Sequence, residues 1–175
     1  LCLGRNFCRL DASLRRGVWE SQWAAAAPPP APWAELAGKT LCILGYGHIG
    51  QTLAQRARAF DMQVHALRRD TTAGADPSLA SLGGPETRGL IGEGELALMK
   101  PTAMLINVAR AEIVDEDALY RALAGGRIAA AALDVWYRYP KDAGPTLPSG
   151  RPFHDLPNVL MTPHASGRHP SDSDT

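Results

Sequence analysis

The glycine spacing in residues 41–50, which read LCILGYGHIG, constrains the fold of this chain more than any other feature. A short apolar run ends in Gly45, Gly47 and Gly50, and apolar residues then recur at helical spacing. This order predicts a strand, a tight turn and a helix, as in dinucleotide-binding folds. There, Gly45 would permit the sharp turn, Gly47 would let a pyrophosphate approach the backbone, and Gly50 would let helix and strand pack closely. The alternative is a glycine-rich turn that binds nothing.

The composition is that of one packed domain, with 175 residues of which 45% are hydrophobic and 21% are charged. The formal net charge is zero, so the chain has no electrostatic footprint for nucleic acid. No apolar run approaches the roughly 18 residues of a membrane span. Cys2, Cys8 and Cys42 are too few for a disulfide framework or a metal site, and Cys42 is predicted to be a small buried residue. These features favour a cytoplasmic protein without a metal, nucleic-acid or membrane partner; the first residue, Leu1, is compatible with a fragment.

Three segments follow from the patterns along the chain. Residues 1–23 show apolar side chains at three- and four-residue spacing, which predicts an amphipathic helix that ends near Gly17. Residues 24–32 are rich in alanine and proline and are predicted to be a spacer, so a linking region covers residues 1–32. The main domain is predicted over residues 33–167. The polar composition of residues 163–175 predicts disorder, with a disordered tail over residues 168–175.

Strands alternate with helices through the main domain. Strands are predicted at residues 41–44, 62–67, 103–108, 128–135 and 159–162, with the strand at 103–108 buried. Helices are predicted after the glycine turn, at residues 93–99 and at residues 116–124. This alternation is typical of an α/β fold of the Rossmann type, a doubly wound parallel sheet with helices on both faces.

The end of the second predicted strand bears on which dinucleotide would bind. A Rossmann fold places an acidic residue here to bind the ribose hydroxyls, whereas this chain has Arg68 and Arg69 before Asp70. Two guanidinium groups favour the 2′-phosphate of NADP, because arginine can bind phosphate through two hydrogen bonds. Alternatively, Asp70 binds the ribose of NAD and both arginines are solvated loop residues.

Three other strand ends carry side chains suited to chemistry. Arg110 follows the strand at 103–108, Asp134 lies at the end of the strand at 128–135, and His164 follows the strand at 159–162. Ligands of open α/β sheets bind at the carboxyl ends of the strands. Each of these residues alone would be unremarkable, but together with the glycine turn they favour a redox site.

The chain resembles the nucleotide-binding domain of the D-isomer-specific 2-hydroxyacid dehydrogenases, which include phosphoglycerate, glycerate and formate dehydrogenases. The resemblance covers roughly residues 33–167, and its motifs occur in the order of the family. They are ELAGKTLCILGYGHIGQTLAQRARAF (35–60), PETRGLIG (85–92), ALMKPTAMLINVAR (97–110), VDEDALYRAL (114–123), RIAAAALDV (127–135) and LPNVLMTPH (156–164).

The resemblance implies a role for each matching position. His48 and Ile49 would lie against the pyrophosphate, and Asp134 would bond the nicotinamide carboxamide or its ribose. Arg110 would grip the carboxylate and carbonyl oxygen of the substrate, and His164 would be the general acid–base. The residues implied to contact the cofactor are Gly45, Gly47, His48, Ile49, Gly50, Arg68, Arg69, Val108, Ala109, Arg110, Asp134, His164 and Gly167.

The chain departs from the family in several places besides Arg68. Tyr139 stands where the family has a glutamate that pairs with the catalytic histidine, and a phenol brings no negative charge to stabilise imidazolium. Any activity is therefore expected to depend on an ionisation at lower pH than in a glutamate-bearing relative. A strand predicted to be central in the sheet, with its preceding helix, is missing before residue 85. The separate N-terminal substrate domain of the family is also absent.

The sequence therefore predicts the cofactor domain of an NAD(P)-dependent oxidoreductase that transfers a hydride between nicotinamide and C2 of a small 2-hydroxy or 2-keto acid. Arg110, His164 and Tyr139 are its predicted catalytic residues, and the resemblance implies a homodimer. Two alternatives remain. Tyr139 favours a non-enzymatic, nucleotide-sensing protein like the C-terminal-binding-protein corepressors, and the missing strand favours a truncated, inactive remnant.

Overall fold

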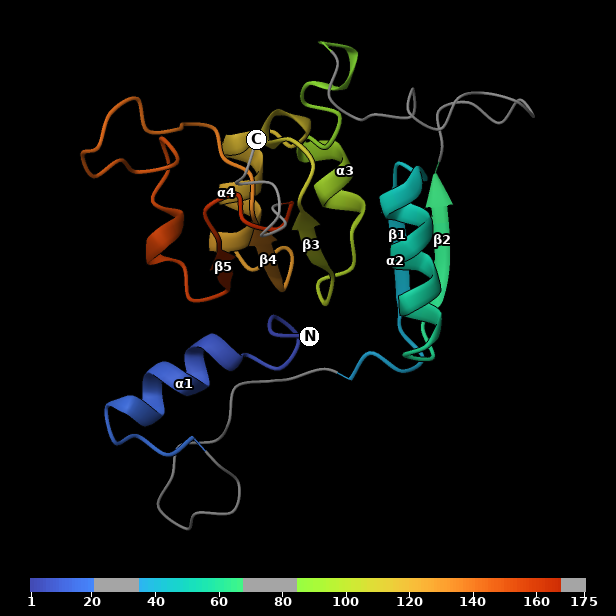
Figure 1. Ribbon diagram of the computed structural model, residues 1–175, viewed down its shortest axis with the longest axis horizontal. Helices are drawn as coiled ribbons and strands as arrows, with labels where there is room; N and C mark the ends of the chain where they lie inside the picture. Colours follow the sequence, from blue (N-terminus) through green and yellow to red (C-terminus); the bar gives the residue numbers. More distant parts are fainter. Residues whose placement is uncertain (21–34, 68–84, 168–175) are drawn as a thin grey trace, which may run out of the picture. The chain divides into compact units, whose positions relative to one another are not determined.

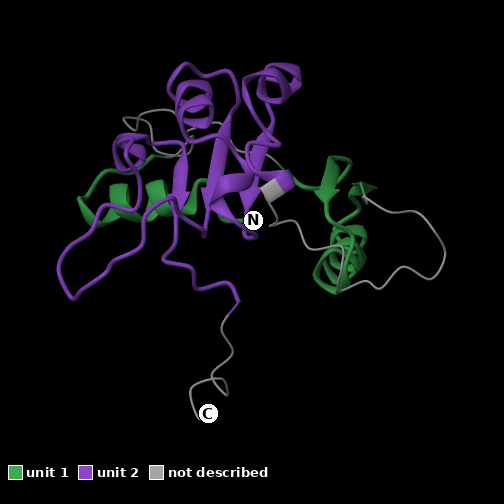
Figure 2. Ribbon diagram, turned by 90° about the horizontal axis from the view of Figure 1, so that it is seen from above, with its two compact units in different colours: residues 1–82 green, residues 83–175 purple. Residues whose placement is uncertain are grey.

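The computed structural model describes residues 1–20, 35–67 and 85–167 (Figure 1). The chain divides into two compact units, residues 1–82 and residues 83–175 (Figure 2). Arg68, Arg69 and Asp70, the Ala/Pro spacer and the predicted tail at 168–175 lie outside the described residues. The domain boundaries at residues 32 and 167 remain predictions.

Helix α1 (Phe7–Arg15) begins later than the helix predicted within residues 1–23. Its N-cap residue Asn6 has φ 53°, and Gly17, just beyond its last turn, has φ 76°. Both values lie in the left-handed region, which a helix cannot continue through. The predicted end near Gly17 is confirmed, and the apolar side chains of Phe7 and Leu14 are each about half exposed.

The glycine turn lies in a β–α–β arrangement, as predicted. Strand β1 (Thr40–Leu44) leads into helix α2 (His48–Arg58), and strand β2 (Gln63–Leu67) returns beside β1 in parallel, with Thr40 opposite Gln63. The prediction that Cys42 is buried is wrong, because its side chain is exposed. Successive strand residues face opposite sides of a sheet, and in β1 only Ile43 is buried.

The unit of residues 83–175 is built on a second parallel sheet, ordered β3–β4–β5 (Figure 1). Its strands are β3 (Met104–Asn107), β4 (Ala130–Leu133) and β5 (Val159–Met161). Helix α3 (Glu93–Leu98) precedes β3, and helix α4 (Glu116–Ala124) links β3 to β4, with the bounds that the sequence predicts for α4. The described part of this unit, residues 85–167, also holds three short 3-10 helices: η2 (Pro85–Thr87), η3 (Ala111–Ile113) and η4 (Phe153–Asp155).

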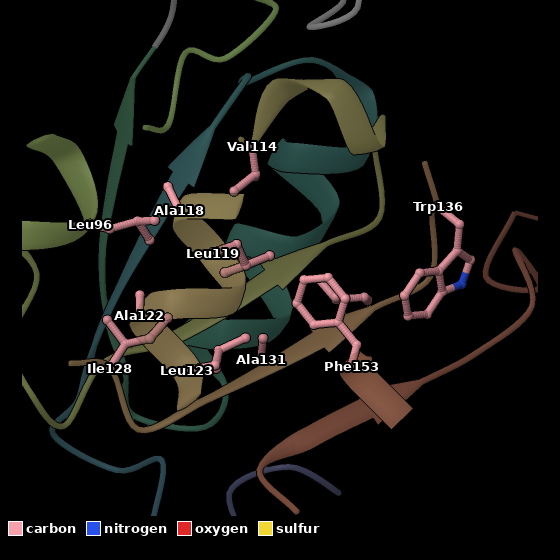
Figure 3. Packing of buried hydrophobic residues seen from close by; sticks show 11 residues of the cluster. Leu96, Val114, Ala118, Leu119, Ala122, Leu123, Ile128, Ala131, Trp136 and Phe153 are labelled. Carbon is pink, nitrogen blue, oxygen red and sulfur yellow. The ribbon is translucent and has the colours of Figure 1, made fainter. Parts of the chain in front are cut away.

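The core of this unit lies around α4 and β4 (Figure 3). Leu119, Ile128 and Phe153 are almost completely buried, and the ring of Phe153 meets those of Tyr120 and Trp136 edge-on at centroid distances of 5.5 and 6.4 Å. The Asp115 side chain caps α4 by accepting from Ala118 N at 2.8 Å. These contacts fix the elements from which the strand ends project.

Strand β3 is less buried than its apolar sequence predicts. Met104 is 37% exposed and Ile106 is 61% exposed, whereas Leu105 packs against the core cluster and Asn107 is buried. One face of β3 therefore contributes to the core. The central strand β4 carries the buried run instead, because it is flanked on both edges and its small alanines allow close packing.

The strands form two separate parallel sheets, β1–β2 and β3–β4–β5. No pairing among the described residues tests where the missing strand would lie, so its predicted central position stays a prediction.

Candidate functional site

The glycine turn has the backbone geometry that its spacing predicts. Gly45 has φ 93°, a conformation that only glycine adopts readily, and its N–H donates to Leu67 O of β2 at 3.0 Å. Gly50 lies so close to the turn that a Cβ on it would be 2.4 Å from Gly45 O. The backbone of the turn therefore excludes a side chain at residue 50.

Helix α2 begins directly after the turn. Gly47 is its N-cap residue, and the N–H groups of a first helical turn have no partner within the helix. His48 and Ile49 are exposed at this end, Ile49 to 81%. An anion such as a pyrophosphate could accept from these N–H groups. The turn is thus a cradle made of backbone, which fits the dinucleotide that the sequence predicts.

The end of β3 is shaped by Asn107, which sequence reasoning did not single out. Its buried side-chain amide donates to Arg110 O at 2.9 Å, and its side-chain oxygen accepts from Ala109 N at 3.1 Å. These two bonds hold Val108, Ala109 and Arg110 in a compact turn beyond the strand. A polar residue at the end of the apolar run MLIN was the signal that could have identified it.

Arg110 projects from this turn. One of its guanidinium nitrogens donates to Ala109 O at 2.7 Å. The residue lines a pocket of about 190 Å³ together with Thr87, Arg88, Glu112 and Ile113. A guanidinium at a pocket can bind a carboxylate through two hydrogen bonds.

Asp134 lies beyond the end of the central strand β4 and is 4% exposed. Its backbone N–H donates to Asn107 O at 3.0 Å, which continues the pairing with β3. Its carboxylate accepts from Thr162 Oγ1 at 2.5 Å, Ala165 N at 2.9 Å, and Ser166 N and Oγ at 3.0 and 2.6 Å. Burial by itself raises the pKa of Asp134, but these hydrogen bonds outweigh it and hold the pKa well below its usual range.

His164 follows β5 and has a left-handed backbone with φ 55°. Its Nδ1 lies 2.9 Å from the hydroxyl oxygen of Tyr139, which comes from the long connection between β4 and β5. The Tyr139 hydroxyl also accepts from Trp136 N at 3.3 Å. The structure therefore joins the two predicted catalytic residues Tyr139 and His164, which are 25 positions apart in the chain.

The connection that carries Tyr139 is held in place at both ends. Trp136 Nε1 donates to Thr162 O at 2.8 Å, and the Tyr137 hydroxyl donates to Val114 O at 2.9 Å. Burial, followed by the charges of Glu116 and other nearby carboxylates, raises the pKa of Tyr137 above its usual range, so it stays a neutral donor. Farther along, Arg151 forms two hydrogen bonds with the Asp117 carboxylate at 2.5 and 2.8 Å.

The predicted site residues thus fall into separate local groups. Asp134, Tyr139 and His164 meet at the ends of β4 and β5, whereas Arg110 lines its own pocket and the glycine turn lies in the unit of residues 1–82. Gly167 lies just beyond Ser166, which binds Asp134. The disorder predicted from residue 163 onward is wrong for residues 163–167, since the buried carboxylate of Asp134 orders them.

Within residues 1–20, 35–67 and 85–167, no three His, Cys, Asp or Glu side chains cluster as a metal ion would require. In the same part of the chain, no helix has the length and apolar character needed to cross a membrane.

A family model described as the NAD-binding domain of D-isomer-specific 2-hydroxyacid dehydrogenases matches residues 1–83 and 78–166. The chain belongs to this family. The resemblance seen in the sequence and the Rossmann-type fold are therefore confirmed.

Curated relatives carry related names. Glyoxylate reductase of Aeropyrum pernix is 38% identical to the chain over 185 residues, covering 95% of this chain and 53% of the relative. D-3-phosphoglycerate dehydrogenase of Methanocaldococcus jannaschii is 35% identical, covering 94% of this chain and 32% of the relative. The chain spans about half the length of the glyoxylate reductases it matches.

Solved structures agree with the fold. An acyclic imino acid reductase in complex with NADPH and D-Arg has a TM-score of 0.76 and 29% identity, covering 96% of this chain and 55% of that chain. A Granulicella formate dehydrogenase has a TM-score of 0.76 and 27% identity, covering 97% of this chain and 48% of that chain.

The alignments also bear on the missing strand. The alignment to the Aeropyrum pernix relative extends over 185 residues, more than the 175 of the chain, although it uses only 95% of the chain. The two matches to the family model meet around residues 78–83. These findings support an internal gap before residue 85.

Proposed function

We propose that this chain is the cofactor-binding part of an NAD(P)-dependent dehydrogenase of small 2-hydroxy acids. The observation that carries the proposal is the pairing of His164 Nδ1 with the Tyr139 hydroxyl at 2.9 Å, at the carboxyl ends of the parallel strands. A histidine oriented by a hydrogen bond is suited to pass a proton to or from a substrate oxygen. The names of the glyoxylate reductase relatives support a small 2-oxo acid as the substrate class.

The residues of the chain divide the work in this proposal. Bound nicotinamide would supply or accept the hydride. His164 would give a proton to the carbonyl oxygen in reduction and take the hydroxyl proton in oxidation, which suits an imidazole because it titrates near neutral pH. Arg110 would bind the substrate carboxylate and polarise its carbonyl. Gly45, Gly47 and Gly50 would hold the pyrophosphate against the start of α2, where a side chain on residue 50 has no room.

We further propose NADP as the preferred cofactor and a homodimer as the assembly. The carbonyl of Leu67 in β2 accepts from the N–H of Gly45 in the glycine turn. Arg68 and Arg69 follow Leu67 directly in the sequence. The half-exposed apolar side chains of Phe7 and Leu14 on α1 support an interface with a second copy.

The first experiment is a thermal melt of the 175-residue chain with and without saturating NADPH or NADH. A ligand that binds only the folded state adds RT ln(1 + [L]/Kd), about 2.7 kcal/mol at a hundredfold excess over Kd. We expect a cooperative melt that NADPH shifts more than NADH. Replacing Arg68 and Arg69 by glutamine should remove the NADPH preference, whereas the same change at Arg56 and Arg58 of α2 should leave it unchanged.

The other results of this experiment separate the alternatives. A larger shift with NADH would overturn the NADP proposal and keep the domain. A cooperative melt that responds to neither cofactor, or no cooperative melt, would indicate an inactive remnant. Cofactor binding without oxidation of NAD(P)H by glyoxylate, when the chain is joined to a family substrate domain, would favour the nucleotide-sensing alternative suggested by Tyr139.

A further inference from the structure

Tyr139 lies in an excursion of the chain between β4 and β5, residues 138–148. Residues 138–147 are all exposed, and Tyr139 itself is 49% exposed. A side chain with so little burial keeps its freedom to move unless the backbone beneath it is fixed. The contact of 2.9 Å between the Tyr139 hydroxyl and His164 Nδ1 therefore depends on what holds the base of the excursion.

The two legs of the excursion are tied together beside Tyr139. Arg138 N donates to Pro148 O at 2.9 Å, which closes the excursion at its base. Gly150 lies close to the Arg138 side chain, because a Cβ on residue 150 would be 2.8 Å from a guanidinium nitrogen. A shift of the second leg would thus move the residue directly before Tyr139.

Glu116, the first residue of α4, holds the second leg. Its Oε1 accepts from Ser149 Oγ at 2.5 Å and from Gly150 N at 2.7 Å. Ser149 is 6% exposed, and its Oγ also accepts from Arg151 N at 2.9 Å. A buried hydroxyl that loses its acceptor destabilises the fold, so this leg has one favourable place against α4.

The start of α4 is a firm base for both legs. Arg151 binds the Asp117 carboxylate through two hydrogen bonds, a geometry that fixes direction as well as distance. The Tyr137 hydroxyl donates to Val114 O, so the first leg also ends near the start of α4. The helix itself is fixed by the core, since Leu119 is completely buried.

We propose that Glu116 is a positioning residue for the pair of Tyr139 and His164. Its carboxylate holds Ser149 and Gly150, which fix the base of the excursion, and the base keeps the Tyr139 hydroxyl on His164 Nδ1. This inference rests on the proposed function only in taking His164 as the acid–base; the positioning itself is a property of the chain without cofactor.

The test measures two nuclear Overhauser effects by NMR of the whole chain without cofactor. The pair signal joins the ring protons of Tyr139 and His164, whose ring centroids are 5.7 Å apart. The reference signal joins those of Tyr120 and Phe153 in the core, with centroids 5.5 Å apart, and reports intact packing. The pair signal is assigned by comparison with Tyr139→Leu and His164→Gln.

Two variants release the second leg from opposite sides. The helix-side variant, Glu116→Ala, removes the acceptor. The excursion-side variant, Ser149→Ala with Arg151→Gln, removes two donor side chains and keeps Glu116. Glu116→Gln keeps an acceptor oxygen in the same place. Glu93→Ala is the matched control, because Glu93 likewise begins a helix, α3, and its carboxylate pairs with Arg121 instead of the excursion.

We expect both releasing variants to reduce the pair signal to less than half of its wild-type size and to leave the reference signal unchanged. Glu116→Gln and the Glu93→Ala control should keep both signals. If the helix-side variant does not fold, the excursion-side variant decides alone, because Arg151 is exposed and Ser149→Ala removes a single atom.

Three results would overturn the proposal. The first is a pair signal that persists in either releasing variant, or that is absent from the wild type. The second is a reference signal that falls together with the pair signal, since Glu116 would then support only the packing of the unit. The third is a loss in Glu116→Gln as large as in Glu116→Ala, since the acceptor oxygen would then not be what holds the leg.

Failure of the proposed function gives a different result. If the wild-type chain binds neither NADPH nor NADH but the releasing variants still lose the pair signal, the positioning stands and the dehydrogenase proposal falls. If the cofactor binds and the pair signal responds to neither variant, the positioning falls and the dehydrogenase proposal stands.

Discussion

The glycine turn at residues 45–50 and the strand-end turn at residues 162–166 are built in opposite ways. In the first, side chains are absent where they would clash, since a Cβ on Gly50 would meet Gly45 O at 2.4 Å. In the second, side chains are required, since the Asp134 carboxylate orders the turn through four hydrogen bonds. An added atom should therefore damage the first turn, and a removed atom the second.

The largest effect should come from the core beneath the second turn. Phe153 is 1% exposed and packs edge-on against Trp136, whose indole N–H holds Thr162 O. Phe153→Ala should lower the free energy of unfolding by about 3–5 kcal/mol, because removing a large buried side chain leaves a cavity. The measurement is urea unfolding followed by Trp136 fluorescence, with Trp19, Trp23 and Trp33 replaced by phenylalanine. Leu147 is 61% exposed and lies, like Phe153, in the connection between β4 and β5. Leu147→Ala should change the free energy of unfolding by no more than about 0.5 kcal/mol.

An added methyl group should break the first turn. Gly50→Ala should lower the free energy of unfolding by an amount near the top of the range of about 1–3 kcal/mol. The added Cβ would clash with the backbone oxygen of Gly45, which cannot rotate away as a side chain could. The variant should also abolish the melting shift caused by NADPH. Gly94→Ala is the control, since nothing lies within 4 Å of its added Cβ and the residue is helical; it should stabilise α3 by up to about 1 kcal/mol. An unaltered NADPH shift in Gly50→Ala would contradict the role of the turn.

Removing the charge in the second turn should change stability with a particular pH dependence. The pKa of Asp134 is lowered in the folded state, so its stabilisation is complete above the unfolded pKa of about 3.9 and is lost as the pH falls through the lower folded pKa. Asp134→Asn should cost about 1–3 kcal/mol at pH 7, because buried donors lose their acceptor. Urea unfolding should show this difference shrinking below about pH 4. A difference independent of pH would contradict the role of the carboxylate charge.

The smallest expected effect is on the pH dependence of activity, and it tests the role of Tyr139. Tyr139→Glu would place a carboxylate beside His164 and favour the imidazolium, so reductive activity in a chain joined to a substrate domain should persist to higher pH by about one unit. Tyr139→Phe, which keeps the ring and removes the hydroxyl, should lower the rate without this shift. A pH–rate profile that does not move in Tyr139→Glu would refute the pairing as a determinant of the active ionisation.

The sequence alone determined the features that depend on local rules. The spacing of Gly45, Gly47 and Gly50 predicted the strand, turn and helix, because a sharp turn, a close ligand approach and close helix–strand packing each favour glycine. The bounds of α4 followed from its capping Asp115 and the Gly125–Gly126 stop. The alternation of strands and helices predicted the parallel pairing.

The tertiary structure decided what depends on contacts between distant residues. It paired Tyr139 with His164 and brought Thr162 and Ser166 onto Asp134, about 30 positions away in the chain, although the composition around Ser166 had predicted disorder. Asn107 likewise showed its role only once its amide lay against the backbone of Ala109 and Arg110. Local patterns carry no information on which donor will meet a buried acceptor, because packing of the sheet sets that geometry.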